Sequence, residues 1–428
     1  MRFTKSQEWL ARGLKVIPLA TQTLSKGTSQ FVQGVAPIYV DRGEGPYLWD
    51  VDGNRWTDYI AALGPIVLGY ADERVNDAIT RQLRRGMSFS MSHYSEVELA
   101  EKICALVPGV DKVRFGKNGS DATAAAIRAA RAYTGREHVA ICGYHGWQDW
   151  YIGTTLRSAG VPQTTRDLSH TFGYNDVAAL EAIFARYPGQ IAGVIVESIG
   201  FTMPENDFLG RCRDIAHENG ALLIFDEIVN GFRLAPGGGG QHFGVTADLI
   251  AFGKAVANGA PISVVGGNSD VMRVFDEIFF STTFGGDTIG IVAALATIDA
   301  MAEHDGYSYL WRQGERLKQG FNQLIARHGL AEHVRCRGLP HHTVVDFIAD
   351  NESQTLIKKS LFQQECLKRG VLFLGIHFTS LAHTDAVIDE TLSAYDEAMG
   401  VMAKATAEGD YLRYLMSEPV KPVFRSRV

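Results

Sequence analysis

Short apolar runs alternate with amphipathic segments through the middle of the chain. The runs at 193–196 and 221–225 are continuously apolar and of strand length, which is typical of strands buried on both faces of a sheet. Residues 214–218, between these runs, have the spacing of a helix. Strands that alternate with helices predict a mostly parallel sheet covered by helices, so the pattern indicates the α/β class.

The pattern changes toward both ends of the chain. Residues 1–64 predict an N-terminal helix and short strands, with turns at 43–45 and 52–54. After about residue 301, the spacing predicts amphipathic helices around short strands. We therefore predict a small N-terminal lobe at 1–64, a large domain at 65–300, and a C-terminal lobe with a tail at 301–428.

Polar residues follow two of the apolar runs. Asp226 comes directly after the run 221–225, and Lys254 follows the apolar segment 249–252. Strand ends of an α/β sheet deliver such groups into a ligand crevice. A lysine amine can form a Schiff base with an aldehyde, and an aspartate can keep a pyridine nitrogen protonated, so the pair indicates pyridoxal phosphate. Either residue alone could equally be a surface lysine or a strand-end cap.

A glycine-containing turn at 115–121 precedes the alanine-rich segment 122–131, which predicts a helix with Ser120 as its N-cap. The amides at a helix start attract phosphate, and Gly119 would let the backbone approach closely. Most such turns only cap a helix. The order along the chain, with the turn first, the aspartate next and the lysine last, favours a phosphate site.

Two apolar side chains are candidates for contacts with a cofactor ring. Tyr144 lies after a short strand in the segment 143–146, where its ring could lie flat on a cofactor, and Ile228 could cover the opposite face. Both could also be ordinary core residues. The glycine run at 237–240 predicts backbone freedom, as either a substrate-gating loop or a plain connector.

The chain resembles the class III, fold-type I aminotransferases from about residue 35 to 398. The segments that carry this resemblance are 118–122, 144–146, 225–228, 248–254 and 283–286. Within the class, the chain is most similar to glutamate-1-semialdehyde 2,1-aminomutase, through residues 49–54, 64–69, 231–233 and 382–384. The resemblance implies a fold-type I PLP-transferase fold, with a mostly parallel central sheet in a large domain and a small α+β domain formed by both termini.

The resemblance also implies roles for single residues. Lys254 would form the Schiff base with pyridoxal 5'-phosphate (PLP), which cycles with pyridoxamine 5'-phosphate, and Asp226 would contact the pyridinium. The other implied cofactor contacts are Gly119 and Ser120 at the phosphate, Tyr144 and Ile228 on the two ring faces, His145 and Glu197 near the cofactor, and Thr283 at the phosphate of the neighbouring subunit. The implied assembly is a homodimer with shared active sites.

Two departures from the aminomutase pattern bear on the reaction. The segment 23–30 lacks the substrate-binding arginine of the aminomutases, and its nearest cation, Lys26, cannot form a bidentate fork with a carboxylate. The mutase glutamate falls at Gly375. These changes favour two-substrate transamination between a donor amine or amino acid and a small carbonyl compound, which could carry hydroxyl groups or be sugar-like. The alternative is intramolecular amine exchange, as in the aminomutase.

Four side chains are candidates for substrate contacts, and each has a structural alternative. Trp147 could belong to the core, Arg233 could anchor a loop, and His377 could be a buried histidine with its hydrogen bonds satisfied. The fourth candidate for a substrate contact is Lys26.

Composition excludes several other functions. The net charge of −7 and the absence of a basic block argue against nucleic-acid binding. The five cysteines are widely spaced, which predicts neither disulfides nor a metal site and favours a cytoplasmic protein. No run approaches the roughly 20 apolar residues of a membrane-spanning helix. The turn at 115–119 lacks the full glycine spacing of a dinucleotide-binding protein. A non-catalytic relative would be expected to lose Lys254 or Asp226, and both are present in this chain.

Overall fold

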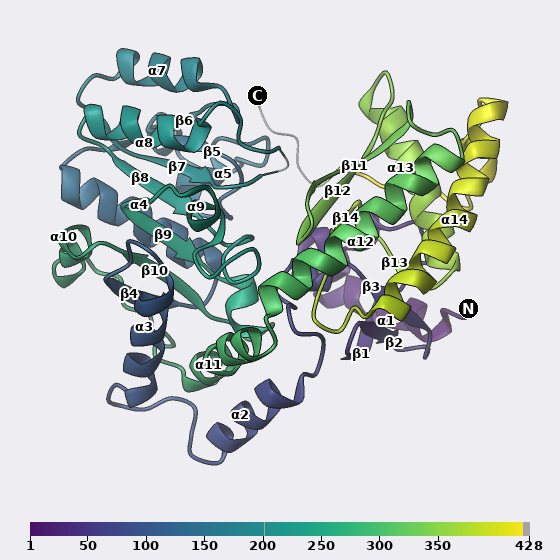
Figure 1. Ribbon diagram of the computed structural model, residues 1–428, viewed down its shortest axis with the longest axis horizontal. Helices are drawn as coiled ribbons and strands as arrows, with labels where there is room; N and C mark the ends of the chain where they lie inside the picture. The colour runs from purple at the N-terminus through teal and green to yellow at the C-terminus, as the bar shows by residue number, and fades with distance from the viewer. Residues whose placement is uncertain (201, 423–428) are drawn as a thin grey trace. The chain divides into compact units, whose positions relative to one another are not determined.

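The computed structural model describes residues 1–200 and 202–422 and divides the chain into two compact units (Figure 1). One unit contains residues 1–72 together with the described residues from 308 onward, and the other contains residues 73–307. The domain boundaries predicted from the sequence, after residues 64 and 300, lie eight and seven residues before the divisions after Asp72 and Tyr307. The end of the predicted tail, residues 423–428, lies outside the described residues.

The unit of residues 73–307 is built on a seven-stranded sheet with the strand order β4-β10-β9-β8-β7-β5-β6. Its strands are β4 Lys112–Gly116, β5 His138–Cys142, β6 Ser169–Thr171, β7 Ile191–Glu197, β8 Leu222–Asp226, β9 Leu249–Phe252 and β10 Ser263–Gly267. The strands from β9 to β6 are parallel, whereas β10 runs antiparallel to both β4 and β9. In the β10–β4 ladder, Ser263 is paired with Gly116.

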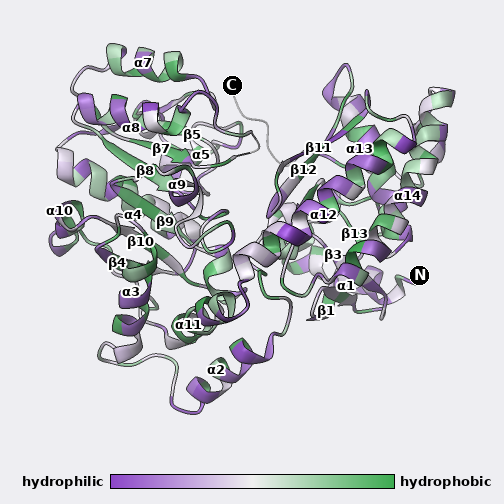
Figure 2. Cartoon of the chain, viewed as in Figure 1, coloured by the Kyte–Doolittle hydropathy of each residue, from purple (hydrophilic) through white to green (hydrophobic). Residues whose placement is uncertain are grey.

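The central parallel strands are apolar on both faces, because the helices that connect them cover both sides of the sheet. Figure 2 shows β7, β8 and β9 as hydrophobic, and every residue of β8 and β9 is buried. The small side chains of Ala125, Ala126 and Ala129 allow the helix Gly119–Thr134 to pack closely in the same core as these strands. The helices of this unit are α2 Glu73–Leu83, α3 Tyr94–Leu106, α4 Gly119–Thr134, α5 Asp149–Ile152, α6 Gln163–Arg166, α7 Val177–Arg186, α8 Phe208–Glu218, α9 Gly238–Phe243, α10 Ser269–Met272 and α11 Thr288–Glu303, with the 3-10 turns η5 Lys254–Ala257 and η6 Arg273–Asp276.

The other unit combines both ends of the described chain. A four-stranded sheet has the order β1-β2-β3-β13, and the parallel pairing of β13 with β3 joins the C-terminal segment to the N-terminal one. A three-stranded sheet has the order β11-β12-β14. The strands are β1 Val40–Glu44, β2 Tyr47–Asp50, β3 Arg55–Asp58, β11 Val334–Leu339, β12 His342–Phe347, β13 Val371–Leu372 and β14 Ile376–Phe378. The helices are α1 Thr4–Val16, α12 Gly306–Arg327, whose first two residues belong to the other unit, α13 Glu352–Lys368 and α14 Asp385–Glu408, with the 3-10 turns η1 Pro18–Ala20, η2 Leu24–Lys26, η3 Thr28–Gln30, η4 Ala61–Leu63 and η7 Leu412–Tyr414.

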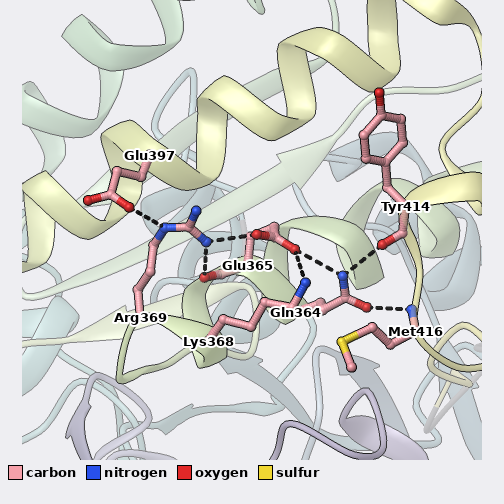
Figure 3. Close-up of polar contacts among 7 residues, drawn as sticks. All are labelled: Gln364, Glu365, Lys368, Arg369, Glu397, Tyr414 and Met416. Atoms are coloured by element: carbon pink, nitrogen blue, oxygen red, sulfur yellow. Dashed lines mark hydrogen bonds and ion pairs between the residues drawn. The ribbon is translucent and has the colours of Figure 1, made fainter.

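A polar network fastens the C-terminal helices of this unit to one another (Figure 3). The amide of Gln364 on α13 donates to the carbonyl of Tyr414 at 2.8 Å. Arg369 pairs with Glu365 on the same helix and with Glu397 on α14. These contacts hold the segment after α14 against α13. Within the described part of the chain, no helix combines the length and the apolarity needed to cross a membrane.

Candidate active site

Lys254 lies in a strained turn at the end of β9. Its φ of 42° places a non-glycine residue in the left-handed region, a conformation that costs energy and occurs often at functional sites. Burial lowers the pKa of Lys254, while the nearby carboxylates of Glu197 and Asp226 oppose this shift. More of the amine is therefore neutral than at an exposed lysine, as a nucleophile or a general base requires.

Asp226 ends the neighbouring strand, β8, and its carboxylate is held on both sides. It is 4% exposed. Its Oδ2 lies 2.8 Å from Nδ1 of His145, and its Oδ1 accepts the backbone N–H of Ile228 at 3.0 Å. Each carboxylate oxygen has a second lone pair, so Asp226 can still accept a hydrogen bond from a ligand.

His145 holds this carboxylate from behind. Its Nε2 lies 3.2 Å from the carbonyl oxygen of Cys142, and its Nδ1 lies 2.8 Å from Oδ2 of Asp226. The imidazole therefore links the carboxylate to the end of β5. Asp226 is thus a fixed, oriented acceptor at the bottom of the site, suited to a protonated ring nitrogen.

The predicted phosphate turn leads into the 16-residue helix α4. Asp121 Oδ2 accepts the backbone N–H groups of Asn118 at 2.8 Å and Lys117 at 3.0 Å, and Asn118 is the N-cap with an extended backbone. The prediction that Ser120 is the N-cap is therefore wrong, because Ser120 lies inside the first turn. Its hydroxyl accepts the N–H of Trp147 at 3.2 Å. The helix start still favours phosphate, since the dipole and the first amides point out of the helix.

Three chain segments meet at the side chain of Ile228. A β-carbon placed on Gly119 would lie 3.1 Å from Ile228, and one placed on Gly253 would also lie 3.1 Å from it. The phosphate turn, the end of β8 and the lysine turn are therefore neighbours. Together they offer a helix start for a phosphate, a carboxylate for a pyridinium and an amine for an aldehyde, which is the donor set that PLP needs.

Glu197 and Tyr144 lie beside this centre. Glu197 ends β7 and accepts the backbone N–H of Tyr144 at 3.0 Å. Burial, with the negative charge of Asp226 as the next cause, raises the pKa of Glu197 to about 7. The ring of Tyr144 meets Tyr151 edge-on and is 49% exposed.

Glu227, for which the sequence predicts no role, is fully buried next to Asp226. It accepts the backbone N–H groups of Gly239 at 3.0 Å and Gly240 at 2.8 Å. A β-carbon on Gly238 would lie 2.0 Å from its Oε2. The glycine run 237–240 is buried around this carboxylate and α9 begins within it, so the run is neither the substrate-gating loop nor the plain connector that its composition suggested: the glycines make room for Glu227. Burial raises the pKa of Glu227 to about 7.

Three further predicted residues belong to the same unit. Arg233 is fully buried, its pKa falls to about 9 through burial, and its charge acts on Lys254. Trp147 is 65% exposed, which excludes the core role considered for it. Thr283 lies exposed in the turn before α11.

The two remaining candidates belong to the other unit. Lys26 is exposed at the end of η2. His377 is 1% exposed, and its two ring nitrogens contact the hydroxyl groups of Thr343 at 2.8 Å and Tyr395 at 3.0 Å. Burial lowers the pKa of His377 to about 3. These features are those of a core histidine, so they favour the structural alternative over a substrate contact.

The family model described as Aminotransferase class-III matches residues 30–404. The chain belongs to this family. The 3-aminobutyryl-CoA aminotransferase of Cloacimonas acidaminovorans (strain Evry) is 33% identical over 411 residues, which cover 92% of this chain and 98% of that protein. The PLP internal aldimine form of the FumI protein of Sphingopyxis sp. MTA144 is 29% identical, with a TM-score of 0.89 over 97% of this chain and 99% of that one.

The similarity to an aminomutase is weaker. A glutamate-1-semialdehyde aminomutase from Pseudomonas aeruginosa PAO1 is 20% identical, with a TM-score of 0.81 over 93% of this chain and 94% of that one, so it shows a shared fold alone. The predicted class III family is thus confirmed, as is the α/β fold-type I architecture with its mostly parallel sheet. Class III aminotransferases use PLP and transfer amino groups between a small-molecule amine and a carbonyl compound, as the sequence predicted for this chain.

Proposed function

We propose that this class III aminotransferase binds PLP between the start of α4 and the turn of Lys254, and that Lys254 is its Schiff-base lysine. The observation that supports the proposal is the meeting of Gly119, Gly253 and Ile228, because it brings the start of α4, the end of β8 and the buried turn of Lys254 together. Tyr144 and Ile228 would cover the two ring faces, and Ser120 would bind the phosphate.

The residues divide the chemistry among them. Bound PLP supplies an aldehyde carbon and an electron sink. Asp226, oriented by His145, would hold a proton at the ring nitrogen. Nζ of Lys254 would hold the aldehyde carbon and, once the donor amine has replaced it there, would take a proton from the donor carbon, which its lowered pKa favours. Glu197 places a second ionisable carboxyl group beside the reacting centre.

We further propose that the donor carries its amine on the carbon β to a carboxyl or thioester group. The support is the relative that acts on 3-aminobutyryl-CoA, since the two proteins align over nearly their full lengths. The acceptor predicted from the sequence, a small carbonyl compound that could be hydroxylated or sugar-like, stays a prediction. Amine exchange within glutamate-1-semialdehyde is the second candidate, supported by the motifs at 64–69 and 382–384.

We also propose a homodimer in which Thr283 reaches the phosphate of the partner. Exposed apolar side chains support this assembly: Phe284, in the turn of Thr283, is 59% exposed, and Met91, in the segment before α3, is 81% exposed. The N–H of Thr288 donates to the carbonyl of Met87, so the segment before α3 lies against the start of α11. Exposed apolar side chains of this size favour coverage by another protein surface. The five free cysteines support a cytoplasmic location.

The test is a half-reaction on the purified full-length protein. Single amines, namely 3-aminobutyrate, alanine, glutamate and glutamate-1-semialdehyde, are added while the visible absorbance of the bound cofactor is followed. We expect 3-aminobutyrate to bleach the absorbance with release of a keto product. Isomerisation of the semialdehyde without a second substrate would establish the aminomutase instead. Lys254→Ala should abolish the borohydride-reducible link to PLP, whereas Lys112→Ala, at an exposed lysine on β4, should retain it.

A further inference from the structure

Lys117 connects the phosphate turn to a distant part of the chain. Its backbone N–H is held by Asp121, as described above, and so belongs to the start of α4. Its Nζ lies 2.8 Å from Oδ2 of Asp287 and 3.2 Å from the carbonyl of Pro261. Both side chains of the ion pair are only 18% exposed, so solvent screens the pair less than a surface pair.

Asp287 is the N-cap of α11 and immediately follows the turn that carries Thr283. Its carboxylate accepts the backbone N–H of Gly290 at 3.4 Å. A β-carbon on Gly290 would lie 3.4 Å from Nζ of Lys117, so the first turn of α11 rests against the lysine amine. The ion pair thus joins the start of α4 to the start of α11, across 170 positions of sequence.

Residues 279–280, just before Thr283, are hydrogen-bonded to β4 and α4, the two elements that flank the phosphate turn. Arg114 on β4 donates to the carbonyl of Phe280 at 2.8 Å, and Arg128 on α4 donates to the carbonyl of Phe279 at 2.6 Å. The turn of Thr283 is therefore held on one side by the two arginines and on the other by the Lys117–Asp287 pair.

We propose that Lys117 and Asp287 are a positioning pair that holds the phosphate turn and the turn of Thr283 in one fixed arrangement. The inference rests on the proposed function, in which Gly119 and Ser120 bind the phosphate of the chain's own cofactor and Thr283 binds that of the partner. In each subunit, the phosphate turn and the turn of Thr283 then keep a constant position relative to each other. Occupancy of one site of the dimer is thereby coupled to the other site through this ion pair.

The charge of Lys117 offers a competing explanation with an opposite prediction. If Lys117 only attracted the phosphate as a point charge, removing the acid beside it would strengthen PLP binding. If the pair positions the two turns, removing either partner weakens PLP binding. Asp287→Asn separates the two explanations, because it keeps the lysine charge and a similar side-chain shape.

The experiment is an equilibrium titration of PLP into the full-length protein after its own cofactor has been removed, read by fluorescence quenching. Lys117→Met and Asp287→Asn should each raise the dissociation constant about fivefold, the upper range for ion pairs that are not deeply buried. The control is Lys102→Met, which breaks a Lys–Asp pair to Asp299 on the same helix α11, away from both turns. The control should bind PLP as the wild type does. Circular dichroism spectra of the variants, compared with that of the wild type, serve as the check that each variant is folded.

Thr283→Val tests the coupling itself. It should weaken PLP binding in the wild-type background and have a smaller effect in the Lys117→Met background, because the turn is then no longer held in place. Asp287→Asn binding PLP as tightly as the wild type, or fully additive effects of the two substitutions, would overturn the positioning pair. A wild-type protein that takes up no PLP, or stays monomeric, would refute the proposed function instead.

Discussion

Two carboxyl groups in the active-site region have unusual protonation. Burial raises the pKa of Glu197 and of Glu227 to about 7, from an ordinary value near 4.5. Between these values the folded chain binds more protons than the unfolded chain. The contribution of these groups to stability is therefore complete below about pH 4.5 and is lost as the pH rises through about 7.

Glu227→Gln tests this linkage, since glutamine keeps the size of the side chain but does not titrate. We expect the variant to be less stable than the wild type at pH 5, because one acceptor for the glycine amides is lost. The difference should shrink by pH 8, where the wild type has lost its own contribution. Urea unfolding of the cofactor-free protein at both pH values measures the difference in the free energy of unfolding between the variant and the wild type. Glu181→Gln, at an exposed glutamate, is the control, and a pH-independent difference would contradict the argument.

Asp226→Asn addresses catalysis rather than folding. Asparagine can still contact a ring nitrogen but does not stabilise its proton, so turnover should fall by roughly a hundredfold or more while PLP stays bound. Steady-state turnover with the best donor, together with the cofactor absorbance, separates the two effects. Asp214→Asn, at an exposed position of α8, should leave both unchanged. Wild-type turnover in Asp226→Asn would remove the electron-sink role.

The sequence predicts single site residues where a local pattern marks them. Asp226 and Lys254 end apolar runs, so strand-end chemistry identifies them. The partner of Asp226 is harder to find, because His145 is 81 positions away and no spacing links the two. The same holds for Glu227, whose amide donors lie in a glycine run that composition alone presents as a flexible loop.

At the level of elements, the start of α9 depends on the absence of a side chain. Gly238→Ala should cost about 3 kcal/mol or more, because its β-carbon would meet the buried carboxylate of Glu227. Gly244→Ala is the matched control, since Gly244 has a similar positive φ but open space around it, so only about 1 kcal/mol of backbone strain is expected. Chemical denaturation measures both. Equal costs would mean that strain, and not the clash, dominates.

The start of α4 shows why helix boundaries are difficult to predict. Asn118 and Ser120 are both good caps by residue type, and the sequence does not decide between them. The choice is made by Asp121, whose carboxylate takes the amides of Lys117 and Asn118 and draws the helix start forward. The helix itself could be predicted, because alanine-rich segments favour helices wherever they begin.

At the level of the whole molecule, the parallel core could be predicted and the long-range pairings could not. Continuous apolar runs identify β7 and β8, whereas the antiparallel course of β10 leaves no mark in its composition. The pairing of β13 with β3 joins residues 371–372 to 57–58, and only the family resemblance indicated that both termini form one small domain.

The proposed dimer makes its own prediction. Met91→Asp places a charge at an exposed apolar position in the segment before α3, so it should shift the protein toward monomers and weaken PLP retention. Tyr133→Asp, at another half-exposed side chain, should not. Sedimentation velocity at several protein concentrations gives the masses. A wild-type protein with the mass of one chain would refute the assembly.

The antiparallel strand β10 has a consequence for motion. Its residue Val264 is paired with Phe252, the last residue of β9 before the lysine turn, and its first residue, Ser263, is paired with Gly116, where β4 ends and the phosphate turn begins. In the proposed site, the spacing between the two ends of PLP would therefore depend on the backbone hydrogen bonds that join β4, β10 and β9. A ligand that contacts both ends would stabilise these hydrogen bonds against local opening. Amide hydrogen exchange along β4 and β10 should therefore slow when PLP binds and quicken when it leaves.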